Sequence, residues 1–170
     1  MGSCSGTVAF GVAVEEEERL PFPWPPELQE ELEFTDDDDP IDLGAYLALR
    51  SGAVDPCEDP GPGYDKWRGW PEGQEPADWE ERLERWRSAK QKVEEEAPVE
   101  ILLLGHYEGT PLYIVALKGT EISTLYSNEA KELVLPTIDQ SQIEAAADFC
   151  KDNDICPFED PKWLLGSSLG

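Results

Sequence analysis

An excess of acidic side chains limits how this chain of 170 residues can fold. The sequence contains 38 aspartates and glutamates against 13 lysines and arginines, a formal net charge of −25. Such an excess destabilises a compact state by self-repulsion, so the apolar residues must be concentrated in a few segments to build a core. Apolar residues make up 39% of the chain and are concentrated in this way. The length is that of about one domain, and we expect a single domain over residues 1–170.

The apolar runs predict the strands of a sheet. Residues 7–14 are apolar and β-branched, which is typical of a buried strand. The runs 99–104 and 112–117 flank a polar turn at residues 108–110 and predict a central β-hairpin over 99–117, buried on both faces. Shorter runs that could add strands lie at residues 122–126 and 163–169.

Other segments have helical patterns. The clearest is Asp78–Glu95, where Trp79, Leu83, Trp86 and Val93 form one apolar stripe. A helix to about Asp152 is expected to start at Thr137 or Asp139. Two short helices are expected at Pro26–Phe34 and Ile41–Arg50, the second capped by one of Asp36–Asp39. Together the elements predict an α+β fold with an antiparallel or mixed sheet and helices packed on it.

A long stretch rich in Pro and Gly, residues 51–76, separates the short helices from the clearest one. We expect it to form a surface loop held by Tyr64, Trp67 and Trp70, not a domain boundary.

The sequence contains few residues that indicate metal binding or catalysis. The only histidine is His106, and the spacing of Cys150 and Cys156 does not match zinc sites. Phosphate-binding glycine motifs are missing from the sequence, and no nucleophile is paired with a base by any motif. The sequence therefore predicts a protein that is not an enzyme and uses no cofactor or metal.

The charge indicates where such a protein acts and what it binds. Affinity for nucleic acid depends on Lys and Arg neutralising phosphates, so direct nucleic-acid binding is not expected. No run is long enough to span a membrane, and four irregularly spaced cysteines suit a reducing compartment, so we expect a cytoplasmic protein. The expected partner is a basic protein, in particular a groove built for nucleic acid.

The acidic residues are densest between residues 15 and 42, where thirteen acids accompany one base, Arg19. Since a duplex carries one charge per ~1.7 Å, 25 net charges correspond to about 40 Å of DNA. A coherent negative face could thus present a duplex-like charge density, although a solvated acidic surface is the alternative. The predicted partner-binding residues are Glu15, Glu16, Glu17, Glu18, Glu27, Glu30, Glu31, Glu33, Asp36, Asp37, Asp38, Asp39 and Asp42.

Several segments near both ends of the chain form a recognisable set: Thr7–Val12, Phe22–Trp24, Pro98–Ile101, Pro111–Thr120, Phe149–Cys150 and Pro161–Trp163. Together they are similar to a family of uncharacterised small acidic bacteriophage proteins. This resemblance implies a phage setting, the host cytoplasm as location, and a role in disabling a host defence complex by occupying its nucleic-acid channel. It brings no active-site residues with it.

Two further hypotheses stay open. One is a nucleotide-binding or sequestering protein whose pocket near the hairpin is walled by Trp67, Trp70, His106 and Tyr107, with positive charge from Lys66, Arg68 and Lys118. The other is a structural or assembly protein of the virion that uses the Trp-rich helix as an interface.

Overall fold

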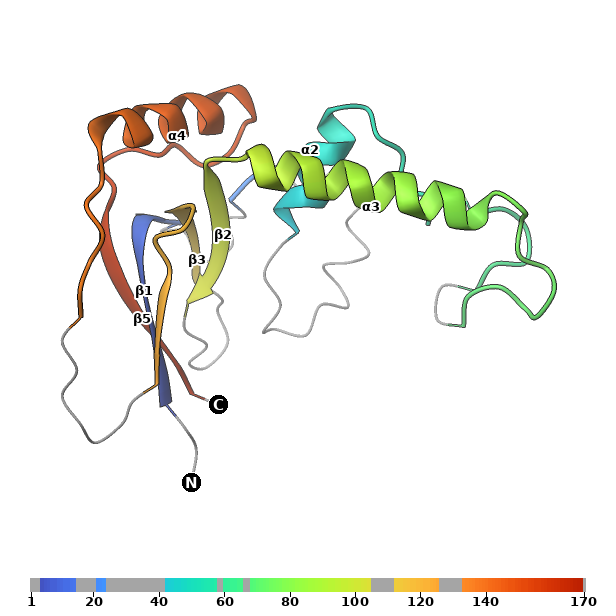
Figure 1. Ribbon diagram of the computed structural model, residues 1–170, viewed down its shortest axis with the longest axis horizontal. Coiled ribbons are helices and arrows are strands. Elements are labelled where there is room, and N and C mark those ends of the chain that lie inside the picture. Colours follow the sequence, from blue (N-terminus) through green and yellow to red (C-terminus); the bar gives the residue numbers. More distant parts are fainter. Residues whose placement is uncertain are drawn as a thin grey trace. The chain divides into compact units, whose positions relative to one another are not determined.

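The computed structural model describes residues 4–14, 21–23, 42–57, 60–65, 68–104, 112–125 and 133–169. Its contacts divide the chain into two compact units, residues 1–41 with 97–170 (unit 1) and residues 42–96 (unit 2). Each unit is described by itself, and the expectation of one domain over residues 1–170 stays a prediction. The predicted α+β class is confirmed (Figure 1).

Unit 1 contains a five-stranded sheet in which every strand pair is antiparallel. All five predicted strands are present, each within three residues of its expected bounds, and Tyr126 lies outside the described ranges. The strands are β1 (Cys4–Ala13), β2 (Val99–Leu104), β3 (Leu112–Leu117), β4 (Ile122–Leu125) and β5 (Lys162–Leu169).

Strand β1 is the centre of this sheet because it is paired along both edges. Val8 is opposite Ile122 of β4 and also opposite Leu165 of β5, so these two strands lie on opposite edges of β1. Farther along β1, Gly11 is opposite both Ala116 of β3 and Lys162 of β5. Strands β3 and β4 therefore share one edge of β1, β5 occupies the other, and β2 lies outside β3.

The two strands on the shared edge are separated by a bulge. Between the Val8–Ile122 and Gly11–Ala116 pairs, Ala9 and Phe10 of β1 face the longer segment 117–121. Gly119 turns this segment with a φ of +77°, a conformation that glycine adopts without strain. The Phe10 N–H donates to Thr120 Oγ1 at 3.1 Å, and the Thr120 hydroxyl donates to the Leu117 carbonyl at 2.6 Å. One buried side chain thus supplies the acceptor that the interrupted ladder lacks.

A small hydrophobic core lies on one face of the sheet. Ala9, Ile114 and Ala116 are fully or almost fully buried there, and Leu102 of β2 and Leu164 of β5 pack against them from the two sides. Small side chains at the centre let the flanking strands approach. At Gly11 the approach is closest, because a Cβ placed there would lie 2.2 Å from the carbonyl oxygen of Val115.

Helix α4 (Gln140–Asp152) completes the described part of unit 1 and crosses one end of the sheet (Figure 1). Asp139 precedes it as one of the two predicted starts, and its N–H donates to the Gln142 side chain at 2.9 Å. Ala146 and Cys150 are fully buried on its inner face. Beyond the helix, the Cys156 N–H donates to the Pro21 carbonyl at 2.6 Å, which ties segment 21–23 to the C-terminal part of the chain.

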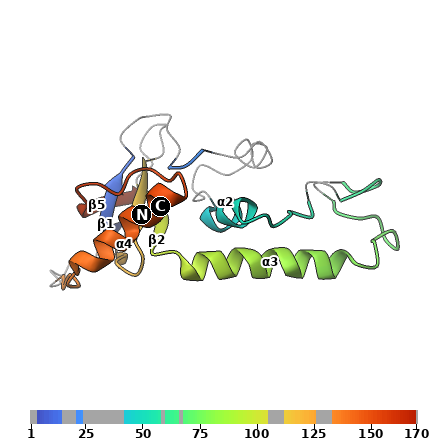
Figure 2. The ribbon, with the colours of Figure 1, turned by 90° about the horizontal axis from the view of Figure 1, so that it is seen from above.

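Unit 2 is an antiparallel helical hairpin, with α2 (Leu43–Arg50) lying alongside α3 (Trp79–Glu96) (Figure 2). Six consecutive residues of α2 are buried, from Leu43 to Ala48. Within the predicted stripe of α3, Trp79 and Trp86 are buried, whereas Leu83 and Val93 are half-buried. The helix predicted at Ile41–Arg50 is confirmed from Leu43 onward, but its cap is Asp42 and not one of Asp36–Asp39. The predicted helix Pro26–Phe34 lies outside the described residues.

Two of the three aromatic residues expected to hold the loop 51–76, Tyr64 and Trp70, pack together with one partner from α3. The rings of Tyr64, Trp70 and Trp79 lie 5.4 to 5.7 Å apart in edge-on or tilted arrangements. Trp67 lies outside the described residues. Among the helices of the described ranges, none combines the length and apolar character needed to cross a membrane.

We expect Thr120→Val to destabilise the protein by about 1–3 kcal/mol, because it leaves the partly buried Phe10 N–H without an acceptor. Thr120→Ser keeps the hydroxyl and is expected to cost less than about 1 kcal/mol. Urea unfolding of both variants measures the difference. Equal losses would show that the hydroxyl does not complete the ladder.

We expect Gly11→Ala to destabilise the protein by about 3 kcal/mol or to abolish folding, because the added methyl group meets the rigid backbone of β3. The control is Gly44→Ala in α2, where the nearest atom is the capping oxygen Asp42 Oδ1 at 3.2 Å, which needs to shift by only a few tenths of an ångström. That change should alter stability by less than about 1 kcal/mol, since alanine also favours the helix. Thermal unfolding would contradict the close-packing argument if both variants behaved alike.

Candidate functional site

The structure describes one of the thirteen predicted partner-binding residues, Asp42. The other twelve lie outside the described ranges, and their role in binding stays a prediction. They are Glu15, Glu16, Glu17, Glu18, Glu27, Glu30, Glu31, Glu33, Asp36, Asp37, Asp38 and Asp39.

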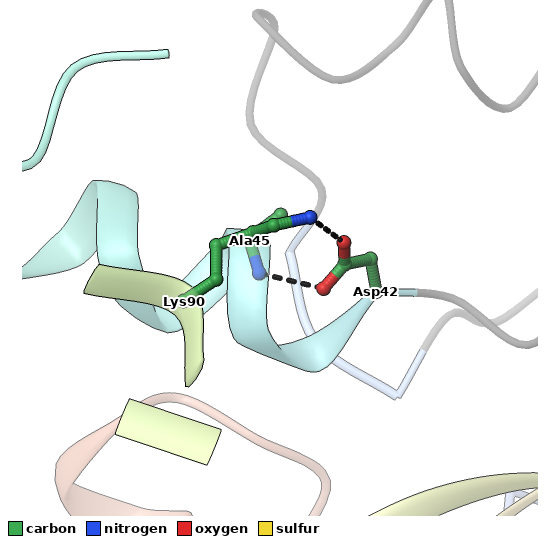
Figure 3. A network of polar contacts seen from close by, with 3 residues as sticks. All are labelled: Asp42, Ala45 and Lys90. Atoms are coloured by element: carbon green, nitrogen blue, oxygen red, sulfur yellow. Dashed lines mark hydrogen bonds and ion pairs between the residues drawn. The ribbon is translucent and has the colours of Figure 1, made fainter. Parts of the chain in front are cut away.

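Asp42 holds the two helices of unit 2 together (Figure 3). Its Oδ1 accepts a hydrogen bond from the Ala45 N–H at 2.7 Å, which caps α2. Its Oδ2 lies 2.6 Å from Lys90 Nζ on α3, and the two side chains are about one-third exposed. The Lys90 ammonium also lies 5.7 Å from the centre of the Trp86 ring. Asp42 therefore has an intramolecular role, and its predicted role in partner binding stays a prediction.

Exposed carboxylates that the sequence analysis did not single out follow the outer face of α4. Glu144, Asp148 and Asp152 are all exposed and recur every four residues, so they stand about 6 Å apart along the helix. Glu144 accepts a hydrogen bond from the Gln140 side chain at 3.2 Å. The i, i+4, i+8 spacing of acids was the signal available in the sequence. We call these three residues the α4 stripe.

Three more exposed acids follow in the segment between α4 and β5: Asp154, Glu159 and Asp160. Lys151 is the one basic residue within α4. The described surface of unit 1 is therefore strongly acidic around this helix.

Unit 2 contains a half-open cleft of about 430 Å³. One wall comes from the segment that follows α2, and the other from the start of α3. The lining residues are Ala53, Val54, Pro56, Asp78, Arg82, Arg85 and Trp86. This cleft was not predicted from the sequence, because Trp86 was assigned to the core stripe. The pair Glu81–Arg85 is present at 3.6 Å between exposed side chains.

The residues proposed for a nucleotide pocket are distributed over both units. Trp70 packs against Tyr64 and Trp79 in unit 2, Arg68 is exposed in the same unit, and Lys118 belongs to unit 1. The remaining candidates lie outside the described residues: Lys66, Trp67, His106 and Tyr107.

No protein-family model matches the chain, and no match was found among curated proteins or solved structures.

Among the described titratable groups, a cysteine and a tyrosine have raised pKa values. Burial raises the pKa of the Cys150 thiol to about 12, with Cys156 adding to the shift, so Cys150 is a protonated core residue near neutral pH. Burial also raises the pKa of Tyr64, and its neighbour Cys57 adds to this effect. Within the described ranges, no group of three or more His, Cys, Asp or Glu side chains is placed to hold a metal ion.

We expect Asp42→Ala to destabilise unit 2 by about 1–2 kcal/mol, because the helix loses its cap and Lys90 loses its partner. Asp42→Asn keeps an oxygen that can cap the helix and should cost less than about 1 kcal/mol, the share of a partly exposed ion pair. Urea unfolding of these variants, alone and combined with Lys90→Ala, gives the coupling energy. A coupling of zero would contradict a contribution of the ion pair to stability.

Proposed function

We propose that this chain binds a protein partner electrostatically, placing its carboxylates in a basic groove that otherwise holds nucleic acid. The observation that carries the proposal is the α4 stripe, Glu144, Asp148 and Asp152, exposed on a helix whose inner face is fully buried. Because Ala146 and Cys150 fix this helix against the rest of unit 1, the three carboxylates keep their spacing without the partner's help. Preorganised charges lose less conformational entropy on binding than charges on a free chain.

The charge density of DNA determines how many acidic residues must contribute to the binding surface. One strand of a DNA duplex presents a charge every ~3.4 Å, whereas the α4 stripe presents one about every 6 Å. The stripe alone therefore supplies roughly half the density of one strand. Asp154, Glu159, Asp160 and the predicted acids of residues 15–39 are the sources that would supply the rest.

The class of partner follows from the same charges. A net charge of −25 repels phosphate backbones, so the complementary surface is rich in Lys and Arg. Charge complementarity of this kind accelerates association and selects partners. A host defence nuclease is the partner that the resemblance to small phage proteins suggests. If the acids only keep the surface hydrated, neutralising a few of them should leave partner binding unchanged.

The experiment uses the full chain as bait in a bacterial lysate at low salt. We expect a retained protein that is released at high salt and displaced by a short DNA duplex. Replacing Glu144, Asp148 and Asp152 by Gln, Asn and Asn should weaken binding about tenfold and flatten its dependence on salt. Neutralising Asp36–Asp39 in a second variant tests the predicted acidic segment in the same way.

The matched control is Glu72→Gln/Glu75→Gln/Glu80→Gln, which removes three exposed carboxylates of unit 2 and changes the net charge equally. This control should bind like the parent chain. The proposal fails if the control and the α4 variant lose binding to the same extent, or if DNA does not compete for the retained protein.

A further inference from the structure

The cleft of unit 2 differs in chemistry from the rest of this acidic chain. Eight of the 13 basic residues lie within residues 42–96, and two of them, Arg82 and Arg85, line the cleft. They are spaced i, i+3 on α3, which places both side chains on one side of the helix. The opposite wall is apolar and consists of Ala53, Val54 and Pro56.

The walls are held in place by contacts within unit 2. After α2, the Ala53 N–H donates to the Ala48 carbonyl at 3.0 Å. The Asp55 side chain, only 6% exposed, then accepts a hydrogen bond from the Cys57 N–H at 2.8 Å. On the facing wall the Arg82 guanidinium lies 5.5 Å from the centre of the Trp79 ring. The cleft is therefore formed before any ligand arrives.

Three groups at the cleft define what it can hold. The two guanidinium groups are forked donors that suit a carboxylate. Asp78 lies one helical turn before Arg82 and can accept an N–H donor. Val54 lines the cleft and is 75% exposed, so its side chain can be covered by an apolar group of a ligand. The ligand that matches all three presents a carboxylate, a backbone N–H and an apolar side chain close together.

We propose that this cleft binds a peptide segment of a partner protein in which an acidic residue adjoins an apolar one. The carboxylate lies against Arg82 and Arg85, and the apolar side chain covers Val54 and Pro56. A half-open cleft favours a peptide, because small-molecule sites usually bury 70–90% or more of the ligand. The exposed Glu81–Arg85 pair does not prevent this, since exposed pairs contribute little and exchange readily. The inference does not depend on the proposed acidic docking.

The experiment uses the full chain and a short capped peptide of alternating leucine and glutamate, compared with the same peptide carrying glutamine. Titrations at about 150 mM salt limit long-range repulsion between the peptide and the acidic protein. Two-dimensional NMR follows the Arg side-chain N–H groups and the Trp86 indole. We expect these resonances to shift with the glutamate peptide and to shift far less with the glutamine peptide.

Two variants and one control test the residues involved. Arg82→Ala/Arg85→Ala should weaken binding about tenfold, because both charge-assisted contacts are lost. Val54→Ser changes an exposed side chain without affecting the fold and should weaken binding about threefold. Arg87→Ala is the control, since this residue lies on the same helix, is exposed and does not line the cleft.

The proposal is overturned if the cleft resonances do not shift, if both peptides bind equally, or if Arg87→Ala weakens binding as much as the cleft variants. It is also overturned if adenosine monophosphate, titrated in parallel, shifts the same resonances at lower concentration than the peptide. That result would assign the cleft to a nucleotide.

Discussion

Strand β1 is paired on both edges over most of its length, and unit 1 is organised around this double pairing. Both faces of β1 are covered as well, since the consecutive residues Val8 and Ala9 are both buried, which explains why residues 8–14 are continuously apolar and do not alternate. Where the backbones of β1 and β3 approach most closely, only certain residues fit. Gly11 is required where β3 comes closest, and Thr120 is required where β3 gives way to β4.

Much of this fold could be predicted, because continuous apolar runs are a strong signal for enclosed strands. Asp139 and the apolar face of α4 were sufficient to place that helix as well. The bulge could not be predicted, since it depends on Thr120 forming a hydrogen bond to a strand more than a hundred residues earlier in the sequence. The predicted cap of α2 was wrong for a local reason. Five aspartates precede this helix, and the residue at which the helix begins determines which of them caps it.

The candidate sites were harder to predict than the fold. The cleft exists only because α2 and α3 lie antiparallel, which brings Val54 and Pro56 opposite Arg82 and Trp86. Nothing in the local pattern of either segment indicates that pairing. Trp86 illustrates the difficulty, since the periodicity that placed it in the core is correct and the same residue also lines the cleft. The α4 stripe was visible as regularly spaced acids, but their exposure depends on which face of α4 is buried.

A chain with a net charge of −25 can fold because its charges are kept away from its strands. Neither β1 nor β3 contains a charged residue, and β2 contains only Glu100, whose pKa is raised by burial. The acids are left to the helices and connections, where water screens them.

This partition gives the two proposed surfaces different responses to salt. Attraction between the acids and a basic groove weakens as salt screens it. An acidic peptide that approaches the cleft is repelled by the rest of the molecule, and salt reduces that repulsion along with the attraction of the two arginines. Binding at the cleft should therefore depend far less on ionic strength, so the slope of affinity against salt separates the two interactions even in one partner.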